Sequence, residues 1–308
     1  MQPTITILYG GIGSEREVSI KSGQAIAEAL NNNFEIIAVE LNKPELPENL
    51  NSKKTIIFPA LHGEFGEDGQ LQTLLEKEGF HYSGCDSQSS EHCFNKSSSK
   101  AILSKNNIHV PQSIVINEKS EIEADEITSR LGLPLIIKPE TGGSSVGLML
   151  VSEKAALVNF LNERPEGSWL IEQRIEGREI TVGILEGKAQ GIVEIEVEGE
   201  LYDFKHKYTK GKTQFHCPAN LPKALTLQIT ELSEKIFKLL ECRDFGRIDF
   251  ILSNNNTPYF LELNTIPGLT STSLLPKSAS CNNLNFEQLA SRLVQPAIKR
   301  FQTDQKSA

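Results

Sequence analysis

Four polar side chains, three of which could bind a metal ion, fall in one predicted β-hairpin. Arg247 and Asp249 alternate on its first strand, Glu262 and Asn264 alternate on its second, and the turn 253–258 between them is rich in Asn. Because side chains alternate along a strand, symmetric closure would place Asp249 opposite Glu262 and Arg247 opposite Asn264. Carboxylate and amide oxygens suit Mg²⁺, but an ion-pair lattice on a solvated sheet face explains the same residues equally well.

A second group of residues suits phosphate. The apolar run 133–138 predicts a strand ending at Lys138, and the loop 141–147 that follows is rich in Gly and Ser. Backbone N–H groups in such a loop can approach phosphate closely, because no Cβ intervenes at glycine. The spacing is not that of a P-loop. The sequence therefore favours a phosphate-binding loop of another kind over a flexible loop with an incidental lysine.

Two further loops combine glycine with acidic residues. The loop 10–16 fails the dinucleotide fingerprint, because Arg16 stands at the third glycine position. Its Glu15 could hold a ligand's ammonium group, although a favourable charge at a helix N-terminus is the simpler interpretation. The loop 62–69 contains three glycines and three acids. A constrained site loop and a capped turn explain it equally well.

Bulk composition narrows the class of protein. With 308 residues, of which 38% are hydrophobic and 23% charged, the chain is typical of a soluble globular protein with two or three domains. A net charge of −9 argues against nucleic acid as a partner. We expect no signal peptide and no membrane span. Five scattered cysteines without CxxC spacing predict reduced thiols in a cytoplasm, instead of a disulfide framework or a zinc site.

Hydrophobic periodicity predicts alternating strands and helices near the N-terminus, which is typical of a small α/β unit with a parallel sheet. The polar passage 83–99 is interpreted as a linker. The apolar run 169–175, which carries Glu172, is interpreted as an edge strand. The polar stretch 198–217 indicates a functional lid or a disordered segment. A C-terminal helix is expected over 286–301.

Taken together, these segments resemble the ATP-grasp superfamily and, within it, the D-alanine–D-alanine ligases. The similarity runs nearly end to end. Its most specific stretches are HGEFGEDG (62–69), KPETGGSSVG (138–147), KYTKGKTQFHCPA (207–219), GRID (246–249) and ELNTIPGLTSTSLLP (262–276). The resemblance implies an α/β fold that is α+β in its ATP-grasp part, with a Rossmann-like N-terminal domain (1–86), a small central ATP-grasp domain (87–175) and a C-terminal ATP-grasp domain (176–308) that carries the metal site and the lid.

The resemblance implies an ATP site. The residues carried over are Lys96 and Lys138 at the phosphates, the backbone around Glu172, Gln173 and Ile175 at adenine, and Glu179 at the ribose.

For the hairpin, the resemblance implies a metal site beside an oxyanion site. Asp249, Glu262 and Asn264 would bind two Mg²⁺ or Mn²⁺ ions, with Glu262 bridging them. Arg247 would face a tetrahedral oxyanion together with the backbone N–H of Gly268, instead of neutralising Asp249.

The substrates implied are ATP and two D-alanine molecules. The implied contacts are Glu15 at the first ammonium group, with Ser144 and Tyr208 in the same hydrogen-bonded set, and Lys207, Ser273 and the Leu274 N–H at the second carboxylate. The reaction expected is ligation to D-alanyl-D-alanine through an acyl phosphate, for peptidoglycan precursors, by a cytoplasmic homodimer. Tyr208 stands where depsipeptide-forming relatives carry His, so D-alanine is expected over D-lactate. The alternatives are an ATP-grasp ligase for another D-amino acid or D-hydroxy acid pair, and a nucleotide-binding regulator without turnover.

Overall fold

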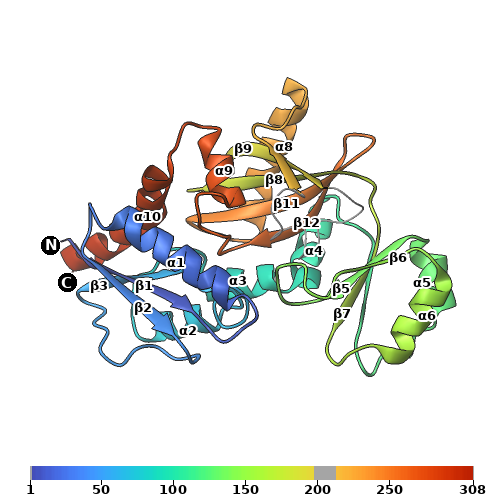
Figure 1. Ribbon diagram of the computed structural model, residues 1–308, viewed down its shortest axis with the longest axis horizontal. Helices are drawn as coiled ribbons and strands as arrows, with labels where there is room; N and C mark the ends of the chain where they lie inside the picture. Colours follow the sequence, from blue (N-terminus) through green and yellow to red (C-terminus); the bar gives the residue numbers. More distant parts are fainter. Residues whose placement is uncertain (1, 198–212, 308) are drawn as a thin grey trace.

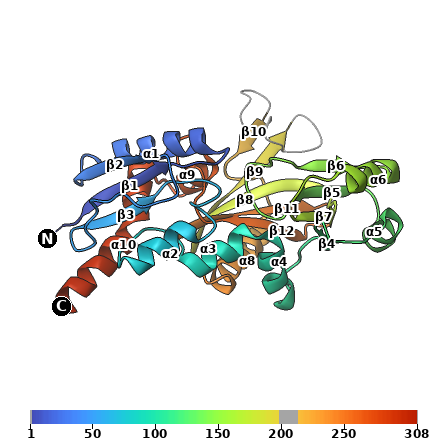
Figure 2. The ribbon, with the colours of Figure 1, turned by 90° about the horizontal axis from the view of Figure 1, so that it is seen from below.

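The structure is a computed structural model that describes residues 2–197 and 213–307. It contains three β-sheets, each covered by helices, and they follow one another along the longest axis of the molecule (Figures 1 and 2). Both chain ends lie beside the N-terminal sheet. No helix within the described ranges is both long enough and apolar enough to cross a membrane.

The N-terminal sheet is parallel, as expected, with the strand order β2-β1-β3. Its elements are β1 (Thr4–Gly10), α1 (Arg16–Leu30), β2 (Ile36–Leu41), β3 (Thr55–Pro59) and α2 (Gln70–Lys77). Alternate residues of β1 face opposite layers. Ile5 and Ile7 pack in the cluster that includes Ile26 of α1, whereas Leu8 packs with Leu71 of α2.

The C-terminal helix completes this N-terminal unit. α10 (Phe286–Ser307) runs through Pro296 and ends six residues beyond the expected 286–301. Its Leu293 and Val294 share a buried cluster with Ile5 of β1. The two ends of the chain therefore build one core. The domain bounds 1–86, 87–175 and 176–308 remain predictions.

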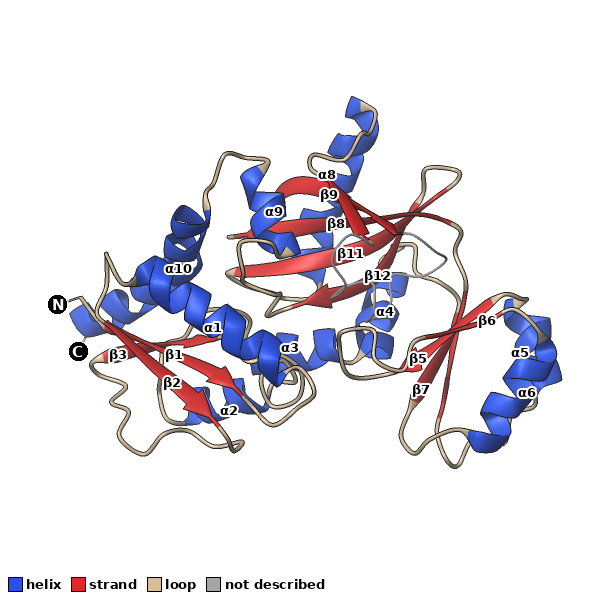
Figure 3. Cartoon of the chain, viewed as in Figure 1, coloured by secondary structure: helices blue, strands red, loops and turns tan. Residues whose placement is uncertain are grey.

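The four-stranded sheet is antiparallel, with the order β4-β7-β5-β6. Its elements are β4 (Ser113–Ile116), α5 (Ala124–Leu131), β5 (Leu135–Pro139), β6 (Met149–Val151), α6 (Lys154–Glu163) and β7 (Trp169–Gln173). The helices α5 and α6 cover one face (Figure 3), and the glycine-rich loop joins β5 to β6. β7 lies between β4 and β5, so its interpretation as an edge strand was wrong: the short β4 pairs with its outer side.

The five-stranded sheet is also antiparallel, with the order β10-β9-β8-β11-β12. Its strands are β8 (Gly177–Leu185), β9 (Lys188–Val197), β10 (Thr213–His216), β11 (Phe245–Ser253) and β12 (Pro258–Asn264). The helices packed on it are α3 (Ser87–Phe94), α4 (Lys96–Lys105), α8 (Lys223–Leu239) and α9 (Leu274–Ser280). Leu103 of α4 and Ile229 of α8 share one buried cluster with β8 and β11. α9 packs close to the sheet, where Ser278 Oγ accepts a hydrogen bond from the N–H of Gly183 at 2.9 Å.

The predicted hairpin is β11 and β12, and its register at the polar residues is confirmed. Asp249 is paired with Glu262, and Arg247 is paired with Asn264. Closure is not symmetric, because the register shifts between Asp249 and Phe250, and Phe250 is paired with Phe260. The extra residue of β12 forms a bulge beside the polar group, a common position for bulges next to functional sites.

Two predictions were wrong. The passage 83–99 is no linker, because it contains α3, which begins after Asp86 and whose first turn is capped by a hydrogen bond from Ser89 N to Asp86 Oδ1 at 2.9 Å. The cysteines are not all reduced, since Cys217 and Cys281 form a disulfide across a sequence separation of 64. That pair has no short spacing that would indicate it in the sequence.

Candidate active site

A cavity of about 940 Å³ lies where the four-stranded and five-stranded sheets meet. Ten of the predicted site residues line it: Lys96, Lys138, Glu172, Gln173, Ile175, Glu179, Arg247, Asp249, Glu262 and Leu274. They come from both sheets and from the starts of α4 and α9. The fold thus gathers the predicted phosphate, adenine, ribose and metal residues around one space.

A buried carboxylate links two lysines at the wall of the cavity. Glu172 of β7 forms an ion pair with Lys138 of β5 at 2.7 Å and a second ion pair with Lys100 of α4. Burial would raise the pKa of Glu172, but the two ammonium groups outweigh it and lower that pKa. One carboxylate cannot compensate two buried cations fully: burial lowers the pKa of Lys100 to about 7. Burial also disfavours the charged form of Lys138, but the negative charges of Glu172 and Glu262 outweigh this effect and raise its pKa.

The glycine-rich loop is fixed to the start of α4. Lys96 donates from Nζ to the carbonyl oxygen of Gly142 at 2.6 Å, and its backbone N–H donates to the carbonyl oxygen of Glu140 at 3.1 Å. Ser144 and Ser145 have φ angles of 52° and 57°, in the left-handed region that costs side-chain-bearing residues energy. Such a turn directs successive backbone N–H groups to one side, which is the arrangement that binds anions.

Three polar residues of the hairpin, Arg247, Asp249 and Asn264, form one network with Thr181 of β8. Arg247 donates to both oxygens of Asp249, from Nε to Oδ1 at 2.9 Å and from Nη2 to Oδ2 at 2.7 Å. Thr181 of β8 donates to Oδ1 of Asp249 at 2.6 Å, and Asn264 donates to Oδ2 at 3.2 Å. The expectation that Arg247 does not neutralise Asp249 was therefore wrong for this state, because two residues on one strand face fall within direct reach.

The residues of the hairpin fit Mg²⁺. Asp249 and Glu262 present two carboxylates from opposite strands to the cavity, and Asn264 lies beside them with an amide. Within the described ranges, no three His, Cys, Asp or Glu side chains gather as a metal site. A site with two acids nevertheless suits Mg²⁺, which commonly uses one or two carboxylates together with water and substrate phosphates.

Glu15 reaches the glycine-rich loop from the N-terminal unit. It precedes α1, and Ser144 donates a hydrogen bond to its Oε1. The approach is close: a Cβ at Gly143 would lie 2.7 Å from Glu15 Oε2. The contact expected between Glu15 and Ser144 is therefore present. Lys207 and Tyr208 lie outside the described residues.

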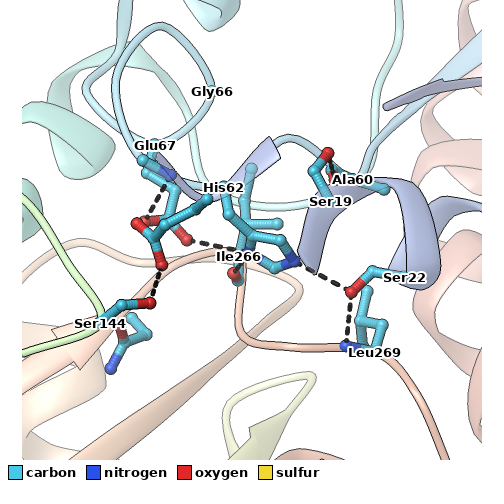
Figure 4. A network of polar contacts seen from close by, with 12 residues as sticks. Ser19, Ser22, Ala60, His62, Gly66, Glu67, Ser144, Ile266 and Leu269 are labelled. Carbon is cyan, nitrogen blue, oxygen red and sulfur yellow. Dashed lines mark hydrogen bonds and ion pairs between the residues drawn. The ribbon is translucent and has the colours of Figure 1, made fainter. Parts of the chain in front are cut away.

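His62 organises the loop that carries Gly268 (Figure 4). Its Nδ1 lies 2.8 Å from the carbonyl oxygen of Ile266, and its Nε2 lies 3.0 Å from Ser22 Oγ. Ser22 Oγ in turn accepts from the N–H of Leu269 at 3.2 Å. A carbonyl oxygen can only accept, so Nδ1 carries a proton, and in the neutral ring Ser22 donates to Nε2. The segment around Gly268 is thus tied to α1 and to the 62–69 loop.

The carboxylate next to His62 is also buried. Glu67 Oε1 lies 3.5 Å from His62 Nδ1, and Glu67 Oε2 accepts from the N–H of Gly63 at 3.3 Å. Burial raises the pKa of Glu67, and the contact with His62 only partly opposes this. The sequence is consistent with either a site loop or a capped turn at 62–69. In the structure, the buried polar side chains of this loop contact the segment that carries Gly268.

Five of the predicted residues that the structure describes, Glu15, Ser144, Asn264, Gly268 and Ser273, lie outside the lining of the main cavity. Ser273 precedes α9, and its Oγ accepts from the N–H of Thr270 at 3.2 Å. Gly268 lies next to it: a Cβ there would be 3.0 Å from Ser273 Oγ. Sequence reasoning missed Lys100, Thr181 and Ser22. Only Lys100 left a signal, because it follows Lys96 by four residues and so shares its helix face.

Known proteins match this chain along almost its whole length. The family model "D-ala D-ala ligase C-terminus" matches residues 102–295, and "D-ala D-ala ligase N-terminus" matches residues 43–85. A D-alanine–D-alanine ligase of Methylacidiphilum infernorum is 37% identical over 302 residues, which cover 96% of each chain.

Solved structures agree with these matches. The crystal structure of a D-alanine–D-alanine ligase from Bacillus anthracis has a TM-score of 0.86 and 33% identity, and covers 98% of this chain and 99% of that one. A structure of that enzyme complexed with ATP also has a TM-score of 0.86, with 31% identity and the same coverage. The expected fold class is thereby confirmed. The chain belongs to the D-alanine–D-alanine ligase family.

Proposed function

We propose that this chain uses ATP to join two D-alanine molecules into D-alanyl-D-alanine, with ADP and phosphate as the other products. The observation that carries the proposal is the single cavity that brings the lysines Lys96 and Lys138 to the carboxylates of Asp249 and Glu262. The two lysine ammonium groups can bind the phosphates of a phosphoryl donor. The two carboxylates can hold the metal ions that neutralise charge on those phosphates. Membership of the ligase family supplies the acceptor.

At the ATP end of the site, the residues of this chain bind and orient the nucleotide. Lys96 and Lys138 would contact the phosphates, while the backbone around Glu172, Gln173 and Ile175 holds adenine, and Glu179 holds the ribose. Lysine ammonium groups that neutralise charge on the transferring phosphoryl oxygens are the main catalytic device of such transfers. When bound at Asp249, Glu262 and Asn264, Mg²⁺ would neutralise further phosphate charge.

At the amino-acid end, one carboxylate must be activated and one amine must attack. A carboxylate oxygen of the first D-alanine takes the γ-phosphoryl group, which makes an acyl phosphate and releases ADP. The amine of the second D-alanine then attacks the acyl carbon, the C–O bond to phosphate breaks, and the amine loses a proton. We assign Glu15, supported by Ser144, to the ammonium group of the first D-alanine, and Arg247 with the Gly268 N–H to the tetrahedral oxyanion.

The second subsite is assigned to the start of α9. Ser273 precedes that helix, and Leu274, its first residue, lines the cavity. Together with Lys207 they would hold the second carboxylate, and Tyr208 would join Glu15 and Ser144. Acyl phosphates hydrolyse readily, so the site has to exclude water during the reaction. The product would serve peptidoglycan synthesis, and we propose a cytoplasmic homodimer that uses Mg²⁺ or Mn²⁺.

The test is phosphate release coupled to dipeptide formation. Purified chain with ATP, Mg²⁺ and D-alanine should release one phosphate for each D-alanyl-D-alanine formed, and L-alanine should not replace the substrate. Absence of D-alanine-dependent phosphate release would refute the proposal. Offering D-lactate or D-serine as the second substrate tests the preference for D-alanine that was inferred from Tyr208. If D-lactate outcompeted D-alanine near neutral pH, that inference would be contradicted.

A further inference from the structure

Lys100 is a buried lysine that the proposed mechanism leaves without a role. It lies on α4, one helical turn after Lys96, and its side chain is 3% exposed. Lysine is seldom buried to this degree unless it is paired, because an isolated ammonium group loses its hydration. Its partner is the carboxylate of Glu172, which is equally buried at 2%.

Lys100 approaches Glu172 from behind the site. Glu172 and Lys138 both line the cavity, and Lys100 does not. The carboxylate uses Oε1 for Lys100 and Oε2 for Lys138. The three groups thus form a row from α4 through β7 to β5, and only Lys138, at the far end, adds a cation to the cavity wall.

The charges in this row affect how much positive charge Lys138 offers. Below the pKa of Lys100, which is about 7, two ammonium groups share the one carboxylate of Glu172, and Lys138 holds the excess positive charge at the cavity. Without Lys100 the row would be a neutral pair, in which Glu172 binds Lys138 alone and compensates its charge. In a poorly hydrated site such an attraction is strong, so Lys138 would offer less charge to phosphate.

We propose that Lys100 is a positioning residue for ATP, which shares the carboxylate of Glu172 and so keeps the charge of Lys138 available to the phosphates. The proposal rests on the proposed function only in taking ATP as the phosphoryl donor. A lysine that merely filled space in the core would predict a different pattern, in which stability falls and all substrates are affected alike.

The first comparison is Lys100→Met against Lys105→Met, an exposed lysine in the last turn of the same helix. Calorimetry with adenylyl-imidodiphosphate and Mg²⁺, at a pH below the pKa of Lys100 of about 7, measures nucleotide binding in the absence of D-alanine. We expect Lys100→Met to weaken binding by at least about tenfold, equivalent to about 1.4 kcal/mol, and Lys105→Met to leave it unchanged. In turnover, the KM for ATP should rise while the KM for D-alanine stays within about twofold of the wild type. Unchanged nucleotide binding in Lys100→Met, or an equal rise of both KM values, would overturn the proposal.

The second comparison asks whether the effect passes through Glu172. In Glu172→Gln no carboxylate remains to hold Lys138, so adding Lys100→Met should change nucleotide binding by less than about twofold. The same loss in both backgrounds would show that Lys100 acts independently of Glu172 and would refute the proposal. If Lys100→Met alone fails to fold, the step from Glu172→Gln to the double variant still tests the proposal, because a loss of about tenfold or more in that step would refute it. A wild-type chain that binds the nucleotide but does not ligate D-alanine would refute the proposed function and leave the result for Lys100 intact.

Discussion

Arg247 and Asp249 form a bidentate ion pair on the face of β11 that lines the cavity, with N–O distances of 2.9 and 2.7 Å. The side chains are 12% and 9% exposed, so the pair is largely shielded from water. The oxygens that a metal ion would need are thus held by a cation of the protein itself. A metal ion bound at Asp249 would compete with the guanidinium, and a displaced guanidinium would become available to the substrate.

This arrangement predicts that Arg247 competes with metal. In Arg247→Met, Mn²⁺ should bind the nucleotide-free chain at least about tenfold more tightly than it binds the wild type, because Asp249 no longer gives up an ion pair. Electron paramagnetic resonance of free Mn²⁺ measures the affinity directly. Arg292→Met, which removes an arginine from a half-exposed ion pair with Glu186, is the matched control. Equal Mn²⁺ affinity in all three proteins would contradict the competition.

The glycine-rich loop predicts a substrate-specific defect. In Gly143→Ala the new methyl group would lie 2.7 Å from Glu15 Oε2, so the carboxylate must move. We expect the KM for D-alanine to rise about tenfold, with a smaller change in the KM for ATP. Gly13→Ala serves as the control, because a Cβ there meets nothing within 4 Å. Steady-state kinetics with each substrate varied would disprove the assignment of Glu15 if both variants behaved like the wild type.

Lys100 predicts a pH dependence of stability. Its pKa is about 7 in the folded chain against an ordinary value of 10.5, so between these pH values the unfolded chain binds one more proton than the folded chain. The free energy of unfolding should therefore rise with pH across this window. Lys100→Met lacks that contribution, so the stability of the wild type relative to the variant should increase from pH 7 to about 9. Urea unfolding at both pH values checks this, and a constant difference would show that Lys100 does not titrate there.

The disulfide predicts sensitivity to reducing agents. Cys217 follows β10 and Cys281 follows α9, so the bond joins the edge strand of the five-stranded sheet to a helix packed on that sheet. Dithiothreitol should lower the free energy of unfolding by about 2–4 kcal/mol, because the unfolded chain regains the entropy of a long closed loop. The variant in which both cysteines are serine should show no response. A wild type that unfolds identically with and without reductant would mean that the bond contributes nothing.

Local patterns predicted the parts of the site that one hairpin or one loop contains. Alternation and an assumed symmetric turn placed Asp249 opposite Glu262, but the pairing next to the turn is shifted by one residue, and the bulge restores the predicted register at the polar residues. The bulge next to them could not be predicted, because one extra residue leaves the hydrophobic pattern nearly intact. Roles for Glu15 and Glu172 came from the family resemblance, not from their own surroundings.

Long-range contacts escaped sequence reasoning. Glu172 and Lys100 lie 72 residues apart and meet only because α4 packs near the junction of two sheets. α3 was missed because its eight residues, including three serines, carry no strong apolar period. The ion pair of Arg247 with Asp249, in contrast, follows from hairpin geometry, because both side chains lie on one face of β11.

The most direct measurement follows an oxygen atom. D-Alanine labelled with oxygen-18 in both carboxylate positions is incubated with the chain, ATP and Mg²⁺, and the phosphate released is analysed by mass spectrometry. Activation through an acyl phosphate transfers one carboxylate oxygen to phosphorus, so each phosphate should carry one labelled oxygen for every dipeptide formed. Dipeptide formation with unlabelled phosphate would contradict the acyl-phosphate route, and labelled D-alanine recovered unchanged beside intact ATP would contradict the ligase itself.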